Sequence, residues 1–196
     1  MLTEIFILCL LGYLCGSIPF GVLLAKTQNM DIREHGSGNI GATNVARTMG
    51  KKAGLMTLVG DVLKGLLVVF AANQWFENTM ITALAGLSVF LGHLYSIFLK
   101  FKGGKGVATG LGALSFAMPL GTLCSAVVFA VCLKISGYVS LSSILAAITL
   151  PLFGIFFKMP FSYIYLSTIV ALFILQRHHD NIVRLTQGTE ANFFKK

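Results

Sequence analysis

Charged residues are scarce in this sequence: they make up 11% of its 196 residues, and only seven residues are acidic. A soluble domain carries about 25% charged residues, so this shortage argues against a soluble fold. Hydrophobic residues make up 56% of the chain and fall in runs of roughly membrane-spanning length. We therefore predict an integral membrane protein. No linker, low-complexity segment or fixed-period repeat divides it, so residues 1–196 are expected to form a single domain.

Several other patterns are missing, and each absence excludes a class of protein. The four cysteines lack zinc-ligand spacing, so no metal site is predicted. The net charge of +8 comes without a basic stretch interleaved with aromatic residues, which argues against nucleic acid as a partner. Residues 1–4 lack the positive charge that opens a signal peptide, so the first apolar run is expected to be retained as a span.

The apolar runs predict the membrane spans. Five runs are clear, at about residues 5–24, 54–75, 80–99, 139–157 and 161–176. A further run, residues 107–133, is interrupted by Pro119 and Gly121, and it forms either one long helix or two short ones. One helix of that length would be about 40 Å long, against a bilayer core of about 30 Å.

Charge helps to choose between these alternatives, because short cytoplasmic loops carry an excess of lysine and arginine. With two short helices, the three polar segments described below and nearly every cation fall on the same side of the membrane. We therefore favour an all-α polytopic membrane protein with seven transmembrane helices, some of them short. Its N-terminus is expected outside and its C-terminus in the cytoplasm.

The first polar segment, residues 36–44 with Arg47, is rich in glycine and in hydrogen-bond donors. Glycine lets the backbone approach an anion closely and a guanidinium neutralises it, so we expect this segment to hold a phosphate group. The alternative is a flexible loop followed by a helix N-cap. The candidate binding residues are Ser37, Gly38, Asn39, Gly41, Thr43, Asn44 and Arg47.

The second polar segment, residues 103–110, is similar to a phosphate-binding loop but lacks the Walker A spacing, which argues against a nucleotide site. Gly103, Gly104 and Gly106 are expected to expose backbone N–H groups, and Lys105 supplies positive charge. A helix that begins at Val107 would direct its N-terminus toward the same anion. The alternative is a glycine-rich turn whose lysines only set the topology.

The third polar segment, residues 178–185, follows the last apolar run directly. His178 is a candidate general base or hydrogen-bond donor. Asn181, three residues later, is a candidate donor to a developing oxyanion. The alternative is an amphipathic tail that rests on anionic lipid.

Ionisable residues also occur inside the apolar runs. Asp61 and Lys64 lie three residues apart on one helix face, and we interpret them as a structural pair that supports the first segment. The alternative is a pathway for substrate or ions. His93 is interpreted as a packing residue. Ser143, with two neighbouring serines, is expected to cap a helix or to line the site.

Together these segments resemble one family, the bacterial acyl-phosphate-dependent glycerol-3-phosphate acyltransferases (the PlsY family). The resemblance extends over nearly the whole chain, from residue 36 to residue 190. It implies an enzyme that moves a fatty acyl group from acyl phosphate to the 1-hydroxyl of sn-glycerol 3-phosphate. The products are lysophosphatidic acid and phosphate, in the first acylation step of phospholipid synthesis. Because acyl phosphate is already activated, no cofactor, metal, coenzyme A or covalent acyl-enzyme is expected.

The resemblance also implies roles for single residues and a location. The two substrates and the lipid bilayer are the expected partners, with no obligatory protein partner. The expected location is the bacterial inner membrane, with the active site facing the cytoplasm. The implied residues are Ser37 and Arg47 in an essential first motif, Gly103, Gly104 and Lys105 in a glycerol-phosphate motif, His178 and Asn181 as an active-site pair, and Glu190 as a structural residue.

The sequence departs from the family pattern at two positions. Ile40 stands where proline is usual, and His179 replaces a commonly basic residue. The general base is therefore left open between His178, His179 and a substrate phosphate. A different acyltransferase class carries Asp five residues after its catalytic His, and none of the four histidines here has one. The alternative function is a small transporter or channel for a phosphorylated anion, which would explain Arg47, Lys105 and the intramembrane charge pair.

Overall fold

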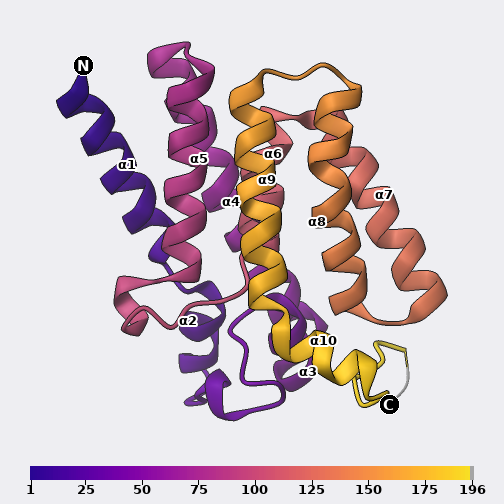
Figure 1. The fold of residues 1–196 in the computed structure, drawn as a ribbon. Coiled ribbons are helices and arrows are strands. Elements are labelled where there is room, and N and C mark those ends of the chain that lie inside the picture. The colour runs from indigo at the N-terminus through magenta and orange to yellow at the C-terminus, as the bar shows by residue number, and fades with distance from the viewer. Residues whose placement is uncertain (195–196) are drawn as a thin grey trace.

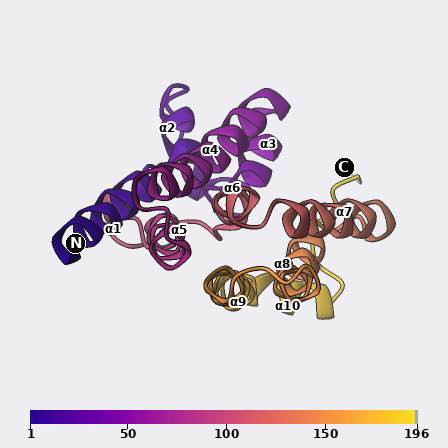
Figure 2. The ribbon, with the colours of Figure 1, turned by 90° about the horizontal axis from the view of Figure 1, so that it is seen from above.

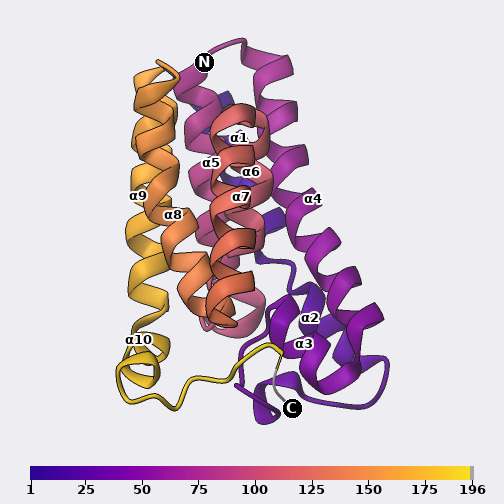
Figure 3. The ribbon, with the colours of Figure 1, turned by 90° about the vertical axis from the view of Figure 1, so that its right-hand side faces the viewer.

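The computed structural model describes residues 1–194, and over this range the chain is helical with no β-strand (Figure 1). One end of the bundle carries helices α2, α3 and α10, and the N-terminus lies at the other end (Figures 1 and 3). The helices are α1 Leu2–Ser17, α2 Phe20–Lys26, α3 Ala42–Met49, α4 Lys51–Phe76, α5 Thr79–Leu94, α6 Val107–Ala117, α7 Pro119–Ser136, α8 Val139–Phe156, α9 Phe161–Arg177 and α10 His179–Thr186, with 3-10 helices η1 Ile32–Glu34 and η2 Ile97–Leu99.

Within residues 1–194, five helical segments are long and apolar enough to cross a membrane, namely Leu2–Lys26, Lys51–Phe76, Thr79–Leu99, Pro119–Ser136 and Val139–Phe156. Two shorter apolar helices, α6 and α9, stand beside them. Large apolar side chains face outward along these helices, as on α7, where Leu123 is 62% exposed. The all-helical membrane architecture is therefore confirmed. The total of seven spans and the sides of the two termini stay predictions.

The ambiguous run at residues 107–133 forms two helices, as the charge distribution favoured. α6 ends at Ala117, Met118 has a non-helical backbone (φ −141°, ψ 65°), and α7 begins at Pro119. Proline suits the first position of a helix because its missing N–H would have no partner there.

The first predicted span is present as Leu2–Lys26, but it consists of two helices. It breaks at Ile18, whose backbone is extended (φ −62°, ψ 114°). Pro19 has no N–H to donate and disfavours a helical conformation in the residue before it. The Ile18 carbonyl, which loses its helical partner, accepts a hydrogen bond from Lys64 Nζ at 2.9 Å. The third predicted span is present as Thr79–Leu99, in which α5 ends at Leu94 and η2 follows.

Helices α4 and α6 approach each other closely through glycine. A Cβ on Gly112 would lie 2.0 Å from the Val62 carbonyl oxygen, and a Cβ on Gly65 would lie 2.2 Å from the Thr109 carbonyl oxygen. Small residues of this kind let membrane helices pack backbone to backbone. Seen from above, α6 lies between α4 and α5 on one side and α7 on the other (Figure 2). This packing places the start of α6, and the glycine loop before it, near the middle of the bundle.

Candidate active site

A single cavity of about 790 Å³ brings the three polar segments together. The predicted convergence of these segments on one site is thus confirmed. Four predicted residues, Gly38, Lys64, Gly103 and Gly104, do not form part of the cavity wall. The predicted residues on the wall are Ser37, Asn39, Gly41, Thr43, Asn44, Arg47, Asp61, Lys105, Gly106, Ser143, His178, Asn181 and Glu190.

The cavity lining changes from polar to apolar along α8 and α9, and α7 adds Thr122 and Ser125 as well as Phe129 and Leu133. On α8 the lining passes from Ser140 and Ser143 to Leu150. At α9 it passes from His178, which follows the helix, to Ile174 and Val170. We call these parts the polar half and the apolar half. The apolar half is lined by Leu111, Leu114, Ala126, Phe129, Leu133, Ala147, Leu150, Val170 and Ile174. Such a cavity suits an amphiphile that carries an anionic head and a long apolar chain.

The first polar segment is organised by Asn44, which is 2% exposed. Its Oδ1 accepts a hydrogen bond from the Ser37 N–H at 2.8 Å, and its Nδ2 donates to the His35 and Asn39 carbonyls at 2.9 Å each. The amide that was predicted to bind substrate therefore holds the loop in shape. Gly36 and Gly38 make this loop possible, with φ of +62° and +70°.

Arg47 and the Ser37 hydroxyl remain available on this wall. Within residues 1–194, neither group has a hydrogen bond or ion pair with the rest of the chain. Arg47 is exposed to the cavity from α3. An unpaired guanidinium here is suited to bind a phosphate through two parallel hydrogen bonds. Ile40, the departure from the family pattern, is buried instead in a small core with Val22 and Val45.

The second polar segment uses its glycines differently from the prediction. The N–H groups of Gly103 and Gly104 donate to the carbonyls of Leu94 and His93, at 3.0 and 3.1 Å, so the expectation that they face an anion was wrong. These carbonyls lie at the last turn of α5, where a helix leaves acceptors without partners. Glycine is required because a Cβ on Gly103 would lie 2.0 Å from the His93 carbonyl oxygen.

Lys105 reaches from this loop to the third segment, where its ammonium donates a hydrogen bond to Asn181 Oδ1. Burial lowers the pKa of Lys105 to about 8, although the carboxylate of Glu190 opposes this shift. The ammonium is therefore charged at neutral pH, and it loses that charge within the mildly alkaline range.

His178 caps the start of α10 and is 3% exposed. Its Nδ1 lies 2.8 Å from the Ile174 carbonyl oxygen, so Nδ1 carries the proton and Nε2 is left as an acceptor. Burial and the nearby positive charge of Lys105 lower the pKa of His178 to about 4, which keeps the ring neutral at pH 7. The neighbouring His179 side chain is 79% exposed and lies outside the cavity wall.

Glu190 ties the third segment to α8. It accepts hydrogen bonds from Ser140 Oγ, Asn181 Nδ2 and Arg184 Nε, each at 2.7 Å. Burial opposes ionisation, but these donors lower the pKa of Glu190 overall. Asn181 is therefore fixed between Lys105 and Glu190. Its side-chain oxygen must face the Lys105 ammonium, which donates, and its nitrogen must face the Glu190 carboxylate, which accepts.

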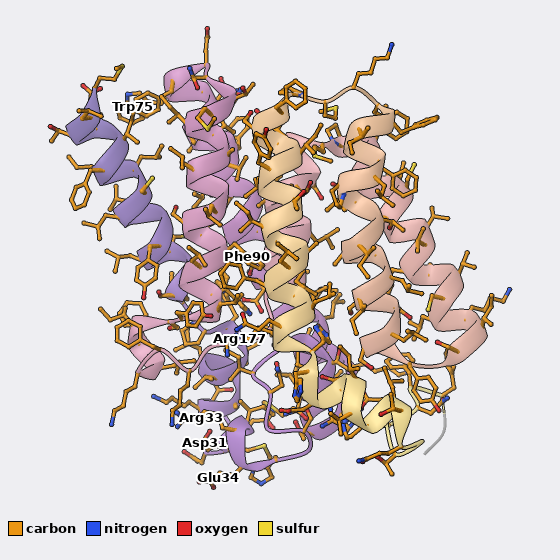
Figure 4. The ribbon with its side chains drawn as sticks, in the orientation of Figure 1. Asp31, Arg33, Glu34, Trp75, Phe90 and Arg177 are labelled. Atoms are coloured by element: carbon orange, nitrogen blue, oxygen red, sulfur yellow. The ribbon has the colours of Figure 1, made fainter. Side chains whose placement is uncertain are left out.

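Two residues of the site were not assigned a role from the sequence. Arg177, at the lower end of α9 in Figure 4, donates to the Leu94 carbonyl at 2.5 Å and stacks over the Tyr95 ring. It thus joins the third segment to the carbonyl that also accepts from Gly103. His93, interpreted as a packing residue, lines the cavity beside Asp61. The sequence did carry a signal for His93, because ionisable side chains inside a membrane span are costly and usually functional.

Among residues 1–194, no cluster of histidine, cysteine and acidic residues has the arrangement of a metal site.

Comparison with known proteins gives consistent matches over the full length. Residues 6–188 match the family model described as glycerol-3-phosphate acyltransferase. The protein of that name from Geotalea daltonii is 47% identical, and the match covers 100% of this chain and 100% of the relative. The one from Trichlorobacter lovleyi is also 47% identical, and the match covers 93% of this chain and 94% of the relative. A crystal structure of PlsY (YgiH), an integral membrane glycerol 3-phosphate acyltransferase in its glycerol 3-phosphate form, superposes with a TM-score of 0.94 at 39% identity, covering 97% of this chain and 96% of that one. Its lysophosphatidic acid form gives a TM-score of 0.91 at 38% identity, covering 96% and 95%.

Proposed function

The chain belongs to the glycerol-3-phosphate acyltransferase family, and on that premise we propose that it transfers a fatty acyl group from acyl phosphate to the 1-hydroxyl of sn-glycerol 3-phosphate. The observation that carries this proposal is the two-part cavity. Its polar half holds Arg47 and Lys105, which form no ion pair within residues 1–194, besides Arg184, which is paired with Glu190, and its apolar half accepts an acyl chain. An acyl donor that itself carries a phosphate gives both halves an occupant.

The reaction joins two anions, so the first task of the site is to hold them together. Arg47 has no partner within the described chain, and Lys105 is bound only through the neutral Asn181 amide. Both cations can therefore bind phosphate groups without first breaking an ion pair. Alignment of a hydroxyl with a carbonyl in this way supplies much of the acceleration of a bimolecular reaction.

In the transfer itself, the glycerol hydroxyl oxygen attacks the acyl carbonyl carbon. The bond from that carbon to the phosphate oxygen breaks, and the phosphate leaves with the electron pair. The hydroxyl proton passes to a phosphate oxygen. We assign it there because a group with a pKa of about 4, such as His178, is a weak base at neutral pH. His178 Nε2 instead accepts a hydrogen bond from the other, unreacting hydroxyl of glycerol 3-phosphate, and so orients the substrate.

A covalent acyl-enzyme is not part of this proposal. The four cysteines lie outside the cavity wall. The serines on the wall are Ser37, Ser125, Ser140 and Ser143, and within residues 1–194 none of them has a hydrogen bond with a histidine. A serine nucleophile needs an adjacent base to activate it.

We place the enzyme in the bacterial inner membrane with the cavity open to the cytoplasm. The polar half lies at the end of the bundle that carries α3 and α10 (Figure 1). Lysines and arginines gather at this end, in the loops after α2 and before α6, as in cytoplasmic loops.

The test is an assay of the purified protein in detergent with acyl phosphate, with and without glycerol 3-phosphate. We expect release of phosphate that depends on glycerol 3-phosphate, and one lysophosphatidic acid formed per phosphate. Acyl-coenzyme A in place of acyl phosphate should give no product. Release without glycerol 3-phosphate, or activity only with the thioester, would refute the proposal.

Two arginines provide a matched pair for this assay. Arg47→Ala is expected to lower kcat/KM by about 100-fold, because it removes a charged partner of phosphate. Arg33→Ala removes an exposed guanidinium that pairs with Asp31 at 2.6 Å outside the cavity, and it should leave activity unchanged.

A further inference from the structure

A buried polar cluster lies directly behind the cavity wall. Lys64 Nζ is 2.7 Å from Asp61 Oδ1 and 2.9 Å from His93 Nδ1, and Thr109 Oγ1 is 3.1 Å from the same His93 nitrogen. The side chains of Asp61, Lys64 and His93 are at most 5% exposed. The third hydrogen of the ammonium goes to the Ile18 carbonyl, which the helix break before Pro19 leaves without a helical partner.

This cluster fixes the tautomer of His93. An ammonium at 2.9 Å can only donate, so Nδ1 must be the acceptor and the ring proton must sit on Nε2. Every hydrogen bond and ion-pair contact of the ring with the described chain is made through Nδ1. Within residues 1–194, the Nε2–H is therefore a donor without an acceptor, on a side chain that is 5% exposed and lines the cavity. Nε2 is not among the fully buried polar atoms of the described residues that lack a partner, so this donor is open to the cavity, where a ligand can accept from it.

His93 also lies where the two halves of the cavity meet. Phe90, one turn earlier on α5 and labelled in Figure 4, belongs to the apolar core behind the wall. Thr109, which contacts His93, lies in the sequence between Lys105 of the polar half and Leu114 of the apolar half. After His93 the chain leaves the helix, and the His93 carbonyl accepts from Gly104, next to Lys105. The ring itself lies against Gly104, where a Cβ would be 2.4 Å from Nε2. A donor at this junction faces the part of an amphiphile that joins its head to its chain.

We propose that the Nε2–H of His93 donates a hydrogen bond to the acyl donor, at an oxygen of the anhydride group that links the acyl chain to phosphate. This inference rests on the proposed function above. Asp61, Lys64 and Thr109 then act as positioning residues, because they hold the imidazole in the tautomer that presents a proton to the cavity. His93 is thus a substrate-contacting residue in addition to those of the three polar segments.

Two substitutions separate this role from a purely structural one. In His93→Gln, the side-chain amide nitrogen reaches the place of Nε2, so the donor is kept and the partner of Lys64 is lost. In His93→Asn, the side chain reaches only the place of Nδ1, so a partner for Lys64 is kept and the donor is lost. A structural role predicts that Asn is the better replacement, whereas our proposal predicts that Gln is.

We expect His93→Asn to lower kcat/KM for acyl phosphate by about 10- to 100-fold, the value of one hydrogen bond to a charged or developing anion. His93→Gln should retain at least about tenfold more activity than His93→Asn, even if its thermal midpoint is lower. KM for glycerol 3-phosphate should change little in both. His179→Gln, which removes a histidine exposed outside the cavity, serves as the matched control and should behave as the wild type.

A second measurement needs no variant at position 93 to fold. In the wild-type protein labelled with ¹⁵N at histidine, the His93 Nε2 resonance should shift when a hydrolysis-resistant acyl phosphonate binds. Full activity of His93→Asn, a ranking of Asn above Gln, or an unchanged resonance would overturn the inference while the wild type remains active. A wild type unable to use acyl phosphate would instead refute the proposed function, and this inference with it.

Discussion

The charge of Lys105 gives the sharpest prediction, because its pKa of about 8 lies within the range of an enzyme assay. Burial disfavours the charged form, so the ammonium loses its proton as the pH rises through that value. With a pKa of about 8, the charged fraction is about nine-tenths at pH 7 and about one-tenth at pH 9. If only the ammonium binds phosphate, kcat/KM for glycerol 3-phosphate should fall about tenfold between pH 7 and pH 9.

The substrate does not contribute to this alkaline decline. The second pKa of a phosphate monoester is about 6, so glycerol 3-phosphate is a dianion throughout this range. Once bound, the dianion stabilises the ammonium and raises its pKa. The decline in kcat should therefore begin at a higher pH than the decline in kcat/KM.

Two substitutions connect the decline to this residue. Lys105→Arg replaces the amine with a guanidinium that stays charged above pH 12, so the decline should vanish even though activity falls through the changed geometry. Lys102→Arg, three residues away at an exposed position, should keep the wild-type profile.

Formation of lysophosphatidic acid is the readout to follow by mass spectrometry, because acyl phosphate hydrolyses on its own at high pH and would obscure phosphate release. A wild-type decline that persists unchanged in Lys105→Arg would refute the reasoning. So would a wild-type profile that stays flat to pH 10.

Two further predictions concern the frame of the site. Glu190→Ala leaves Ser140, Asn181 and Arg184 without their acceptor, so it should destabilise the fold by about 1–3 kcal/mol and lower kcat; wild-type activity and thermal midpoint would contradict this. Gly112→Ala forces a methyl group against the Val62 carbonyl oxygen and should cost about 1–3 kcal/mol, measured as a lower thermal midpoint in detergent. Gly121→Ala is its control, because the nearest atom to the added methyl is the flexible end of Met118 at 3.3 Å, and the next atoms lie at ordinary contact distances of 3.5 and 3.9 Å. Equal midpoints for both variants would show that the α4–α6 contact is not tight.

Hydropathy and charge predicted much of the architecture from the sequence. The helix break near Pro119 followed from the excessive length of one helix and from the distribution of cations, and it was confirmed. The break at Pro19 was missed because the residues around it are uniformly apolar and the run has an ordinary length for a span. The length of an apolar run indicates a helix break only when the run is too long for one span. A proline inside a run of ordinary length, such as Pro19, was therefore given too little weight in predicting the break.

The site was predicted in outline because donors and glycines cluster in the sequence, but a cluster does not reveal which partner each group takes. Asn44 was interpreted as a ligand of phosphate, yet its amide bonds to its own loop. Gly103 and Gly104 are needed for close backbone contact rather than for exposed N–H groups. His93 was interpreted as a packing residue, because its partner Lys64 is 29 residues away and only the fold brings them together.

The position of Glu190 has a consequence for biosynthesis. The cavity takes walls from α3, from the loop before α6 and from α8, but the carboxylate that fixes Asn181 comes after all ten α-helices within residues 1–194. Chains emerge from the ribosome with the N-terminal part first. Every apolar helix of residues 1–194 is therefore synthesised before the last wall of the pocket exists, and a nascent chain cannot complete its binding site until Glu190 has been added.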